Sequence, residues 1–252
     1  MNTIEKVVNC SIALACLAQL PLPALAQTDE AAGSQAVSEV PVLEEVLVTA
    51  TRRVESLQDV PMSVSAFSEQ FLQDSGLTEL NELDQYTPNL RITTATDSRS
   101  TSIRIRGIGS VGSNSGVDPS VGLFIDGVYQ GRSGMSIADL VDVRQVEVLR
   151  GPQGTLYGKN TSAGAISILT NPPVANFESM GEVTYDNHEQ LELRGMVNVP
   201  LGDSGHALRL SGFGVDGDHR FENDYTGKGV NDANKWGGRA RLLLDLEGNN
   251  RA

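Results

Sequence analysis

The C-terminal third of the chain alternates between apolar and polar positions. Over residues 191–199 the odd-numbered positions are mainly apolar, and over 239–246 the even-numbered positions are apolar. Segments 178–186, 189–200, 206–216 and 236–246 share this pattern and are separated by turn-forming residues. A period of two predicts β-strands with one apolar face. Lengths of ~9–11 residues are typical of strands that cross a membrane.

The connections between these strands also alternate in length. Short links at 187–188 and 201–205 contrast with a long one at 217–235. Outer-membrane β-barrels have short turns on one side and long loops on the other. A secreted β-sandwich would alternate in a similar way, so the pattern alone leaves both interpretations open.

Residues 60–173 mix strand and helix patterns instead. Leu77, Leu80 and Leu83 share one helical face, with Thr78 as the predicted N-cap and Pro88 as the stop. Ser68 is a plausible start for an earlier helix. Strand patterns occupy 61–67, 101–106, 121–128, which contains an Asp-Gly turn, and 143–149. We therefore expect a mixed α/β domain ahead of the antiparallel strands.

The first 26 residues have the pattern of an export signal. An apolar run from Val7 follows Lys6 and ends at Ala24-Leu25-Ala26, the pattern of a cleaved signal peptide. An uncleaved anchor helix is the alternative, and Pro21 disfavours it. Both cysteines, Cys10 and Cys16, lie in this segment. The mature chain is then expected to have no disulfide, thiol nucleophile or thiolate metal site.

Charge and composition exclude one class of partner. The 252 residues carry a formal charge of −13 without a basic stripe, which argues against nucleic-acid binding. Residues 27–41 are small and acidic without periodicity and are expected to form a disordered lead.

No motif in the chain proposes an enzyme. Gly107 to Gly112 has dinucleotide-site spacing, but the Ser- and Gly-rich residues after it cannot continue as the required helix. Gly154 to Lys159 lacks the first glycine of a phosphate loop. The three histidines have no metal-ligand spacing, and no catalytic triad is visible. We expect no catalytic residue, resident metal or cofactor.

Residues 43–53, LEEVLVTATRR, contain a short strand pattern flanked by charges. It is either an ordinary first strand or a mobile strand offered to the edge of a partner sheet. The residues alone favour the ordinary strand.

Five motifs in order resemble the N-terminal part of TonB-dependent outer-membrane receptors. They are LEEVLVTATRR, SLQDVPMSVSAFS, SIRIRGIGS, DPSVGLFIDGVYQGR and VDVRQVEVLRGPQGTLYGKNTSAGAISILTNPP. The resemblance is strong over 43–173, weak over the following strands, and most specific over 146–173. It implies a signal peptide (1–26), a disordered lead with a TonB box (27–52), a plug domain (53–173) and the first strands of a truncated outer-membrane β-barrel (174–252).

The resemblance also assigns roles to residues. The TonB box, which must be loosely held to be available to TonB, is Glu45, Val46, Leu47, Val48, Thr49 and Ala50. Charges that pair the plug with the barrel wall are Arg104, Arg106, Glu147 and Arg150, and the plug motif contains Gly151, Pro152, Gly154, Tyr157, Gly158 and Gly164. Its glycines are expected to permit turns or close backbone approach. Ligand-facing loop residues are Ser110, Asn114, Asp118, Gln130 and Arg132.

The implied function is binding and gated transport in the outer membrane. The expected partners are TonB of the energising inner-membrane complex, outer-membrane lipid and a scarce small ligand, most commonly an iron–siderophore complex. Such receptors close their barrel with about 22 strands, whereas four strand patterns follow Pro173 here. We therefore expect a fragment unable to transport alone. The alternatives are a secreted all-β binding or adhesion protein and a stand-alone periplasmic plug-like protein.

Overall fold

The computed structural model describes residues 46–94, 101–110, 116–131, 140–186, 190–202, 205–217, 221–223, 225, 228–230 and 233–245. The predicted signal peptide, the acidic lead and Glu45 lie outside the described residues. Among the described residues, no helix has the length and apolar character needed to span a bilayer.

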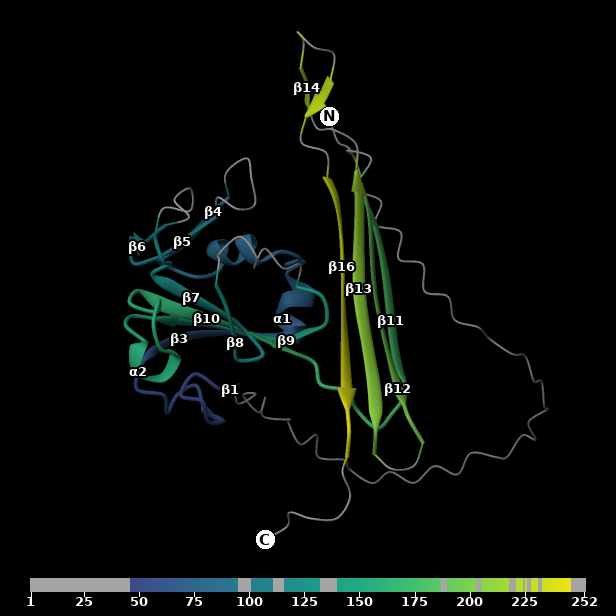
Figure 1. Ribbon diagram of the computed structural model, residues 1–252, viewed down its shortest axis with the longest axis horizontal. Coiled ribbons are helices and arrows are strands. Elements are labelled where there is room, and N and C mark those ends of the chain that lie inside the picture. Colours follow the sequence, from purple (N-terminus) through teal and green to yellow (C-terminus); the bar gives the residue numbers. More distant parts are fainter. Residues whose placement is uncertain are drawn as a thin grey trace, which may run out of the picture. The chain divides into compact units, whose positions relative to one another are not determined.

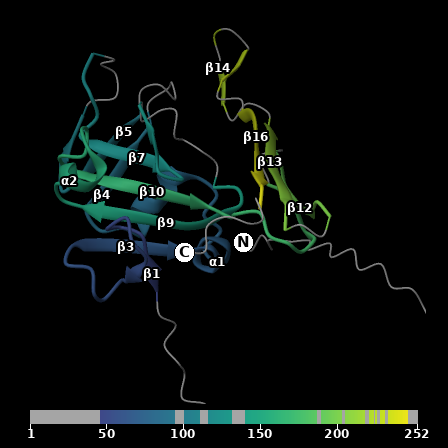
Figure 2. The ribbon, with the colours of Figure 1, turned by 60° about the horizontal axis from the view of Figure 1, so that its bottom comes forward.

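A five-stranded mixed sheet forms the centre of the N-terminal domain, in the order β3-β9-β10-β7-β8. Figure 2 shows β3, β9, β10 and β7 side by side. The strands β9 and β10 pair antiparallel, whereas β10 and β7 pair parallel. Their bounds are β3 (Ser63–Ser68), β7 (Val121–Ile125), β8 (Val128–Gln130), β9 (Val143–Arg150) and β10 (Gly164–Thr170).

Two short helices begin on local hydrogen bonds. Helix α1 (Glu69–Asp74) starts as predicted at Ser68, whose hydroxyl accepts from the Phe71 amide. The 3-10 helix η1 (Leu80–Gln85) buries Leu80 and Leu83. The predicted cap at Thr78 is wrong, because Glu79 is the N-cap of η1. The Glu82 carboxylate accepts from the amides of both Thr78 and Glu79. The capping box is therefore formed by Glu79 and Glu82, and the N-cap lies one residue after the predicted one.

Smaller elements complete this domain. A three-stranded sheet contains β4 (Leu90–Thr93), β5 (Ser102–Ile105) and β6 (Ile108–Gly109). The strands β1 (Leu47–Val48) and β2 (Glu55–Ser56) form a separate pair, and helix α2 (Gly154–Tyr157) follows β9. The predicted Asp-Gly turn joins β7 to β8, with φ of 47° at Asp126 and 80° at Gly127. Positive φ at both positions matches a type I′ hairpin turn.

The central sheet is covered on both faces. One face, with Val146, Val148 and Ile166, packs with the leucines of α1 and η1 and with β4 and β5. The opposite face, with Leu149 and Ala165, packs against the segment that contains β1. This second cluster consists of Val48, Ala50, Val60, Phe124, Leu149 and Ala165.

The C-terminal strands form a separate antiparallel sheet in the order β11-β12-β13-β16, drawn in green to yellow in Figure 1. Their bounds are β11 (Glu178–Tyr185), β12 (Leu191–Pro200), β13 (Ala207–Gly217) and β16 (Ala233–Leu243). These are the four strands that the alternation predicted. The long connection also contains a hairpin that the sequence pattern did not indicate, β14 (Phe221–Asn223) with β15 (Lys228–Val230).

This sheet has its polarity inverted relative to a water-soluble domain. Large apolar side chains such as Val183, Leu193 and Trp236 are exposed, the last to 84%. Polar side chains on the other face are buried, including Asn198 and Arg209. An exposed apolar face with a buried polar face is the arrangement of strands in lipid. The predicted fold class, a mixed α/β plug followed by antiparallel strands of an unclosed barrel, is confirmed, and a purely all-β protein is not what the chain forms.

Candidate functional site

The predicted TonB box lies on the plug, and one edge of its strand is paired. The strand β1 pairs antiparallel with β2, placing Leu47 opposite Ser56 and Val48 opposite Glu55. Just before this pair, the Leu57 amide donates to the Val46 carbonyl at 2.9 Å. The chain therefore turns back on itself within ten residues to cover this edge.

The other edge of β1 is covered by two side chains from β9. The Gln145 amide Nε2 donates to the Leu47 carbonyl at 2.8 Å. The Thr49 main-chain N–H donates to Glu147 Oε1 at 2.6 Å, and the Thr49 hydroxyl donates to the same oxygen at 2.9 Å. Both main-chain edges of the segment are thus hydrogen-bonded.

The side chains of the segment are divided between the core and the surface. Val48 and Ala50 are 0% exposed, whereas Val46 and Leu47 are 40% and 49% exposed. The expectation of a loosely held segment is wrong for residues 46–50. Alternation along the strand buries one side of it, and the hydrogen bonds fix its main chain.

Glu147 is a buried carboxylate at the centre of this contact. Its side chain is fully buried. Burial raises the pKa of Glu147 above its usual value, and the hydrogen bonds from Thr49 oppose that rise. Among the described residues, no side chain or amide bonds its second oxygen, Oε2. Thr49 therefore supplies the two hydrogen bonds that Glu147 accepts within the part of the chain that the structure describes.

Arg52 fixes the end of the segment. Its amide closes a turn on the Thr49 carbonyl at 2.8 Å, and its Nε donates to the Leu156 carbonyl at 2.8 Å. The guanidinium carbon lies 5.0 Å from the centre of the Tyr157 ring, a cation–π distance. Burial, with the nearby Glu147 carboxylate, raises the pKa of Tyr157 to about 12, although Arg52 acts in the opposite direction. Arg52, two residues after the box, thus joins this end of the segment to Tyr157 of the predicted plug motif.

The glycines of the plug motif serve different purposes. Gly151 and Gly158 have φ of 108° and 81°, which disfavours any other residue. A Cβ at Gly164 would lie 2.4 Å from the Leu149 carbonyl oxygen, so two strands approach closely there. Gly154, next but one after Pro152, begins α2 with open space around it.

Two of the four charges predicted to meet the barrel wall, Glu147 and Arg150, make hydrogen bonds within the plug. Glu147 bonds Thr49, as described. Arg150 donates to the Pro88 carbonyl at 3.3 Å and to the Ser65 hydroxyl at 3.2 Å, both inside the plug. Arg104 and Arg106 are exposed. Their pairing with a barrel wall stays a prediction.

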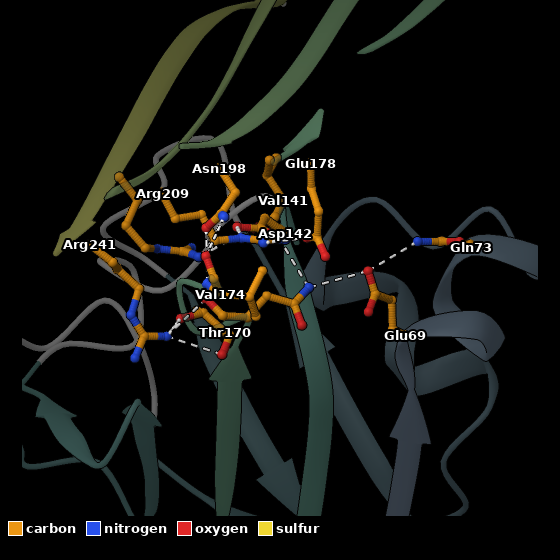
Figure 3. A network of polar contacts seen from close by, with 12 residues as sticks. Glu69, Gln73, Val141, Asp142, Thr170, Val174, Glu178, Asn198, Arg209 and Arg241 are labelled. Carbon is orange, nitrogen blue, oxygen red and sulfur yellow. Dashed lines mark hydrogen bonds and ion pairs between the residues drawn. The ribbon is translucent and has the colours of Figure 1, made fainter. Parts of the chain in front are cut away.

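A different set of residues joins the plug to the sheet (Figure 3). Arg209 on β13 donates to both carboxylate oxygens of Asp142, at 2.9 and 2.7 Å, and to Glu178 at 2.9 Å. Asn171 donates to Asp142 at 3.1 Å and to Glu69 at 3.2 Å, which extends the network to α1. Sequence reasoning missed this network. The charged positions on the polar face of β13 and β16 were its only visible sign.

Two further contacts support the same junction. Arg241 on β16 donates to the Thr170 carbonyl at 3.1 Å and the Asn171 carbonyl at 3.2 Å. Asn198 on β12 donates to the Val174 carbonyl at 2.8 Å and accepts from its amide at 3.1 Å. The segment between β10 and β11 is therefore held by hydrogen bonds from side chains of β12 and β16 to its main chain. These bonds connect the first strands of the sheet to the end of β10.

Glu79 and Lys235 form an ion pair between the plug and β16. Burial works against ionisation of Glu79, but the hydrogen bond and charge of Lys235 outweigh it and lower the pKa of Glu79. Both side chains are partly buried, with 36% of Lys235 and 30% of Glu79 exposed.

Three of the five predicted ligand-facing residues, Ser110, Asp118 and Gln130, are among the residues that the structure describes. The Ser110 hydroxyl donates to the Asp118 carbonyl at 2.6 Å, joining two loop segments. Gln130 donates to the Val128 carbonyl at 3.2 Å within β8. Asn114 and Arg132 lie outside the described residues. A ligand-binding role for this set stays a prediction.

Comparison with known proteins agrees with this geometry. Residues 56–165 match the family model "TonB-dependent Receptor Plug Domain". The chain is 35% identical over 157 residues to the pesticin receptor of Yersinia enterocolitica, covering 62% of this chain and 22% of that protein. It is 25% identical over 186 residues to the ferripyoverdine receptor of Pseudomonas aeruginosa, covering 72% and 22%.

Solved structures show the same fold. The crystal structure of the ferric yersiniabactin uptake receptor from Yersinia pestis superposes with a TM-score of 0.62 at 30% identity. The match covers 70% of this chain and 27% of that one. The chain thus spans about a quarter of the length of the relatives it matches.

Proposed function

We propose that this chain, which carries a TonB-dependent receptor plug domain at residues 56–165, is part of a TonB-dependent outer-membrane receptor and serves in TonB-driven uptake of an iron–siderophore complex across the outer membrane. The process is ligand binding and gated transport, without bond chemistry.

One observation carries this proposal. A folded plug is bonded through the buried Arg209–Asp142 pair to the polar face of a sheet whose apolar face is exposed. Such a sheet suits lipid on one side and a plug on the other. A soluble plug-like regulator would not need the apolar face, and a secreted adhesion protein would not need the plug.

The ligand class is supported by the names of the similar proteins. Two of them are described as receptors for ferripyoverdine and for ferric yersiniabactin uptake. We propose that this chain takes the same class of ligand, an iron chelate, at the loops carrying Ser110, Asp118 and Gln130. The particular chelator depends on surfaces beyond these loops.

The box segment couples ligand binding to TonB in this proposal. We propose that ligand binding releases residues 45–50 from the plug, after which they add as a strand to TonB. Strand addition gives affinity through main-chain hydrogen bonds and needs little side-chain specificity. Tension on the segment then reaches the plug through Arg52, Tyr157 and β9.

Transport also requires that the open sheet edges find partners. The strands β11 and β16 are the edges of the described four-stranded sheet. Unpaired main-chain groups in lipid cost several kcal/mol each. We propose that these edges pair with further barrel strands in the transporting molecule.

Uptake of radioactive iron by the native host tests the proposal. The box (45–50) is deleted from the chromosomal gene, and an equal deletion in the acidic lead (30–35) is the matched control. We expect loss of energy-dependent uptake with retained surface binding in the first strain, and normal uptake in the second. Unchanged uptake after removal of the box contradicts the proposal.

A further inference from the structure

We propose that Gln145 and Glu147 act as a side-chain substitute for a partner strand, occupying the edge of β1 that TonB must use. This inference rests on the proposed function, because it takes residues 45–50 to be the TonB-binding segment. The two side chains compete with TonB for the same edge, so TonB can pair there only after they are displaced.

The main-chain groups of the box segment point alternately to its two edges. In an antiparallel pair, alternate residues direct their N–H and C=O groups to opposite edges of a strand. The Val46 carbonyl points to the β2 side, where Leu57 donates to it. Leu47 and Thr49 therefore present their main-chain groups to the other edge, where Gln145 bonds the Leu47 carbonyl and Glu147 bonds the Thr49 N–H.

The spacing of the two side chains on β9 matches the spacing of the main-chain groups that they bond. Gln145 and Glu147 are two residues apart on β9, so their side chains leave the same face of that strand. Leu47 and Thr49 are also two residues apart on an extended segment, a repeat of about 6.7 Å. The two repeats match, so each side chain of β9 meets one main-chain group of the box.

Gln145 and Glu147 offer the same kinds of hydrogen-bonding group as a main chain. The group facing the Leu47 carbonyl is an amide N–H of Gln145, and the group facing the Thr49 N–H is a carboxylate oxygen of Glu147. An amide donor and an oxygen acceptor are what the main chain of an added strand would present. The two side chains thus occupy the Leu47 carbonyl and the Thr49 N–H as a partner strand would, so TonB must displace them to bond these groups in the same way.

The contact between β9 and the box is reversible because it is made by side chains. Side chains supply the bonds on this edge, so they can rotate away without moving β9, whose own main chain is paired with β3 and β10. A strand from TonB replaces these bonds with main-chain bonds of the same kind. The exchange therefore leaves the box satisfied in both states, and the balance depends on Gln145 and Glu147.

The experiment uses variants of the full chain in detergent. Gln145→Met and Glu147→Met remove the donor and the acceptor while keeping an unbranched side chain. Arg144→Met is their matched control, because Arg144 directly precedes Gln145 on the same strand and is exposed. Thr49→Val removes only the hydroxyl bond to Glu147, and Thr51→Val removes the equivalent hydroxyl bond to Glu55.

Two quantities are measured for each variant. Hydrogen exchange of the amides in residues 46–50, followed by mass spectrometry, reports how firmly the segment is held without any partner. Titration with the purified periplasmic domain of TonB reports whether the edge is available. Thermal unfolding followed by circular dichroism shows which variants fold, and Thr49→Val provides a conservative test where a methionine variant does not.

We expect Gln145→Met and Glu147→Met to raise exchange in the segment about tenfold, the size of one lost hydrogen bond to a polar or charged group. Affinity for the TonB domain should rise by a similar factor. Thr49→Val should show a smaller rise in both, and Arg144→Met and Thr51→Val should stay within about twofold of the unmodified chain.

Three results overturn the inference, and they differ in what they say of the proposed function. Equal TonB affinity in the unmodified chain and all variants means that Gln145 and Glu147 do not guard the edge, while the proposed function stands. Absence of TonB binding in every protein, including the unmodified chain, removes the proposed function and the inference with it. Unchanged hydrogen exchange in the methionine variants also overturns the inference.

Discussion

The Arg209 guanidinium binds the Asp142 carboxylate through two hydrogen bonds of 2.9 and 2.7 Å, although 67 residues separate them along the chain. Their side chains are 5% and 4% exposed. The pair joins the turn before β9 to the polar face of β13, and Glu178 adds a third bond to the same guanidinium. The first barrel strands are thereby fixed to the plug at a buried point.

Arg209→Met should destabilise the chain by about 3–5 kcal/mol, because it leaves the Asp142 carboxylate buried without its cation. The exposed Arg91, which lies 3.8 Å from Asp84, provides the control. Arg91→Met should change stability by less than about 1 kcal/mol. Urea unfolding of both variants in detergent measures the difference. Equal losses would show that the Arg209–Asp142 pair is not a buried structural link.

Gly164→Ala should destabilise the plug by about 1–3 kcal/mol. The new methyl group would lie 2.4 Å from the Leu149 carbonyl oxygen and 2.6 Å from Ile105 Cδ1. The first of these is main chain in the paired strand β9, so β10 must move away from it. Thermal unfolding of the plug measures the change.

Gly181→Ala on β11 is the control for that substitution. Nothing lies within 4 Å of a Cβ at Gly181, so the change should be within about 0.5 kcal/mol of neutral. If both alanine variants unfold at the same temperature as the unmodified chain, the close approach of β9 and β10 at Gly164 is absent.

Much of the fold was predictable because the alternation of the barrel strands is strong. In β11, β12, β13 and β16 most polar residues lie on one face and most large apolar residues on the other, with exceptions such as Phe213 and Val215 on the polar face. The Asp126-Gly127 turn was predictable for a local reason, since it needs positive φ at two adjacent residues. The hairpin of β14 and β15 was missed because three-residue strands carry too little pattern.

The sites were less predictable, because their partners are distant in the chain. The strand pattern at 46–49 was visible, but Gln145 and Glu147 lie 98 residues away from the groups they bond. Glu147 was therefore assigned to the barrel wall by resemblance, although the structure places it under the box. Asp142 gave no sign at all, since a single aspartate in a turn predicts only solvent exposure.

The Glu79–Lys235 pair should make stability depend on pH on the acidic side. The pKa of Glu79 is lowered in the folded chain, so the ionised form is favoured there. Its contribution is fully present above the ordinary glutamate pKa, near 4.5, and is lost as the pH falls through the lowered value. Glu79→Gln should therefore reduce the loss of stability between about pH 5 and pH 3. Urea unfolding over that range measures it, with Glu69→Gln as a control on another carboxylate.

Glu147 should produce the opposite dependence. Burial raises the pKa of Glu147 in the folded chain, so the folded plug binds a proton more readily than the unfolded chain does. Stability from this group is then greatest below the ordinary value of 4.5 and falls as the pH rises through the raised value. Glu147→Gln stays neutral throughout, so its stability relative to the unmodified chain should increase as the pH rises from about 4 to 8. Unfolding in urea at several pH values gives this difference, in which the contribution of Glu79 cancels because both proteins contain it. A constant difference across the range would mean that Glu147 titrates alike in the folded and unfolded chain, and that the carboxylate under the box is open to water.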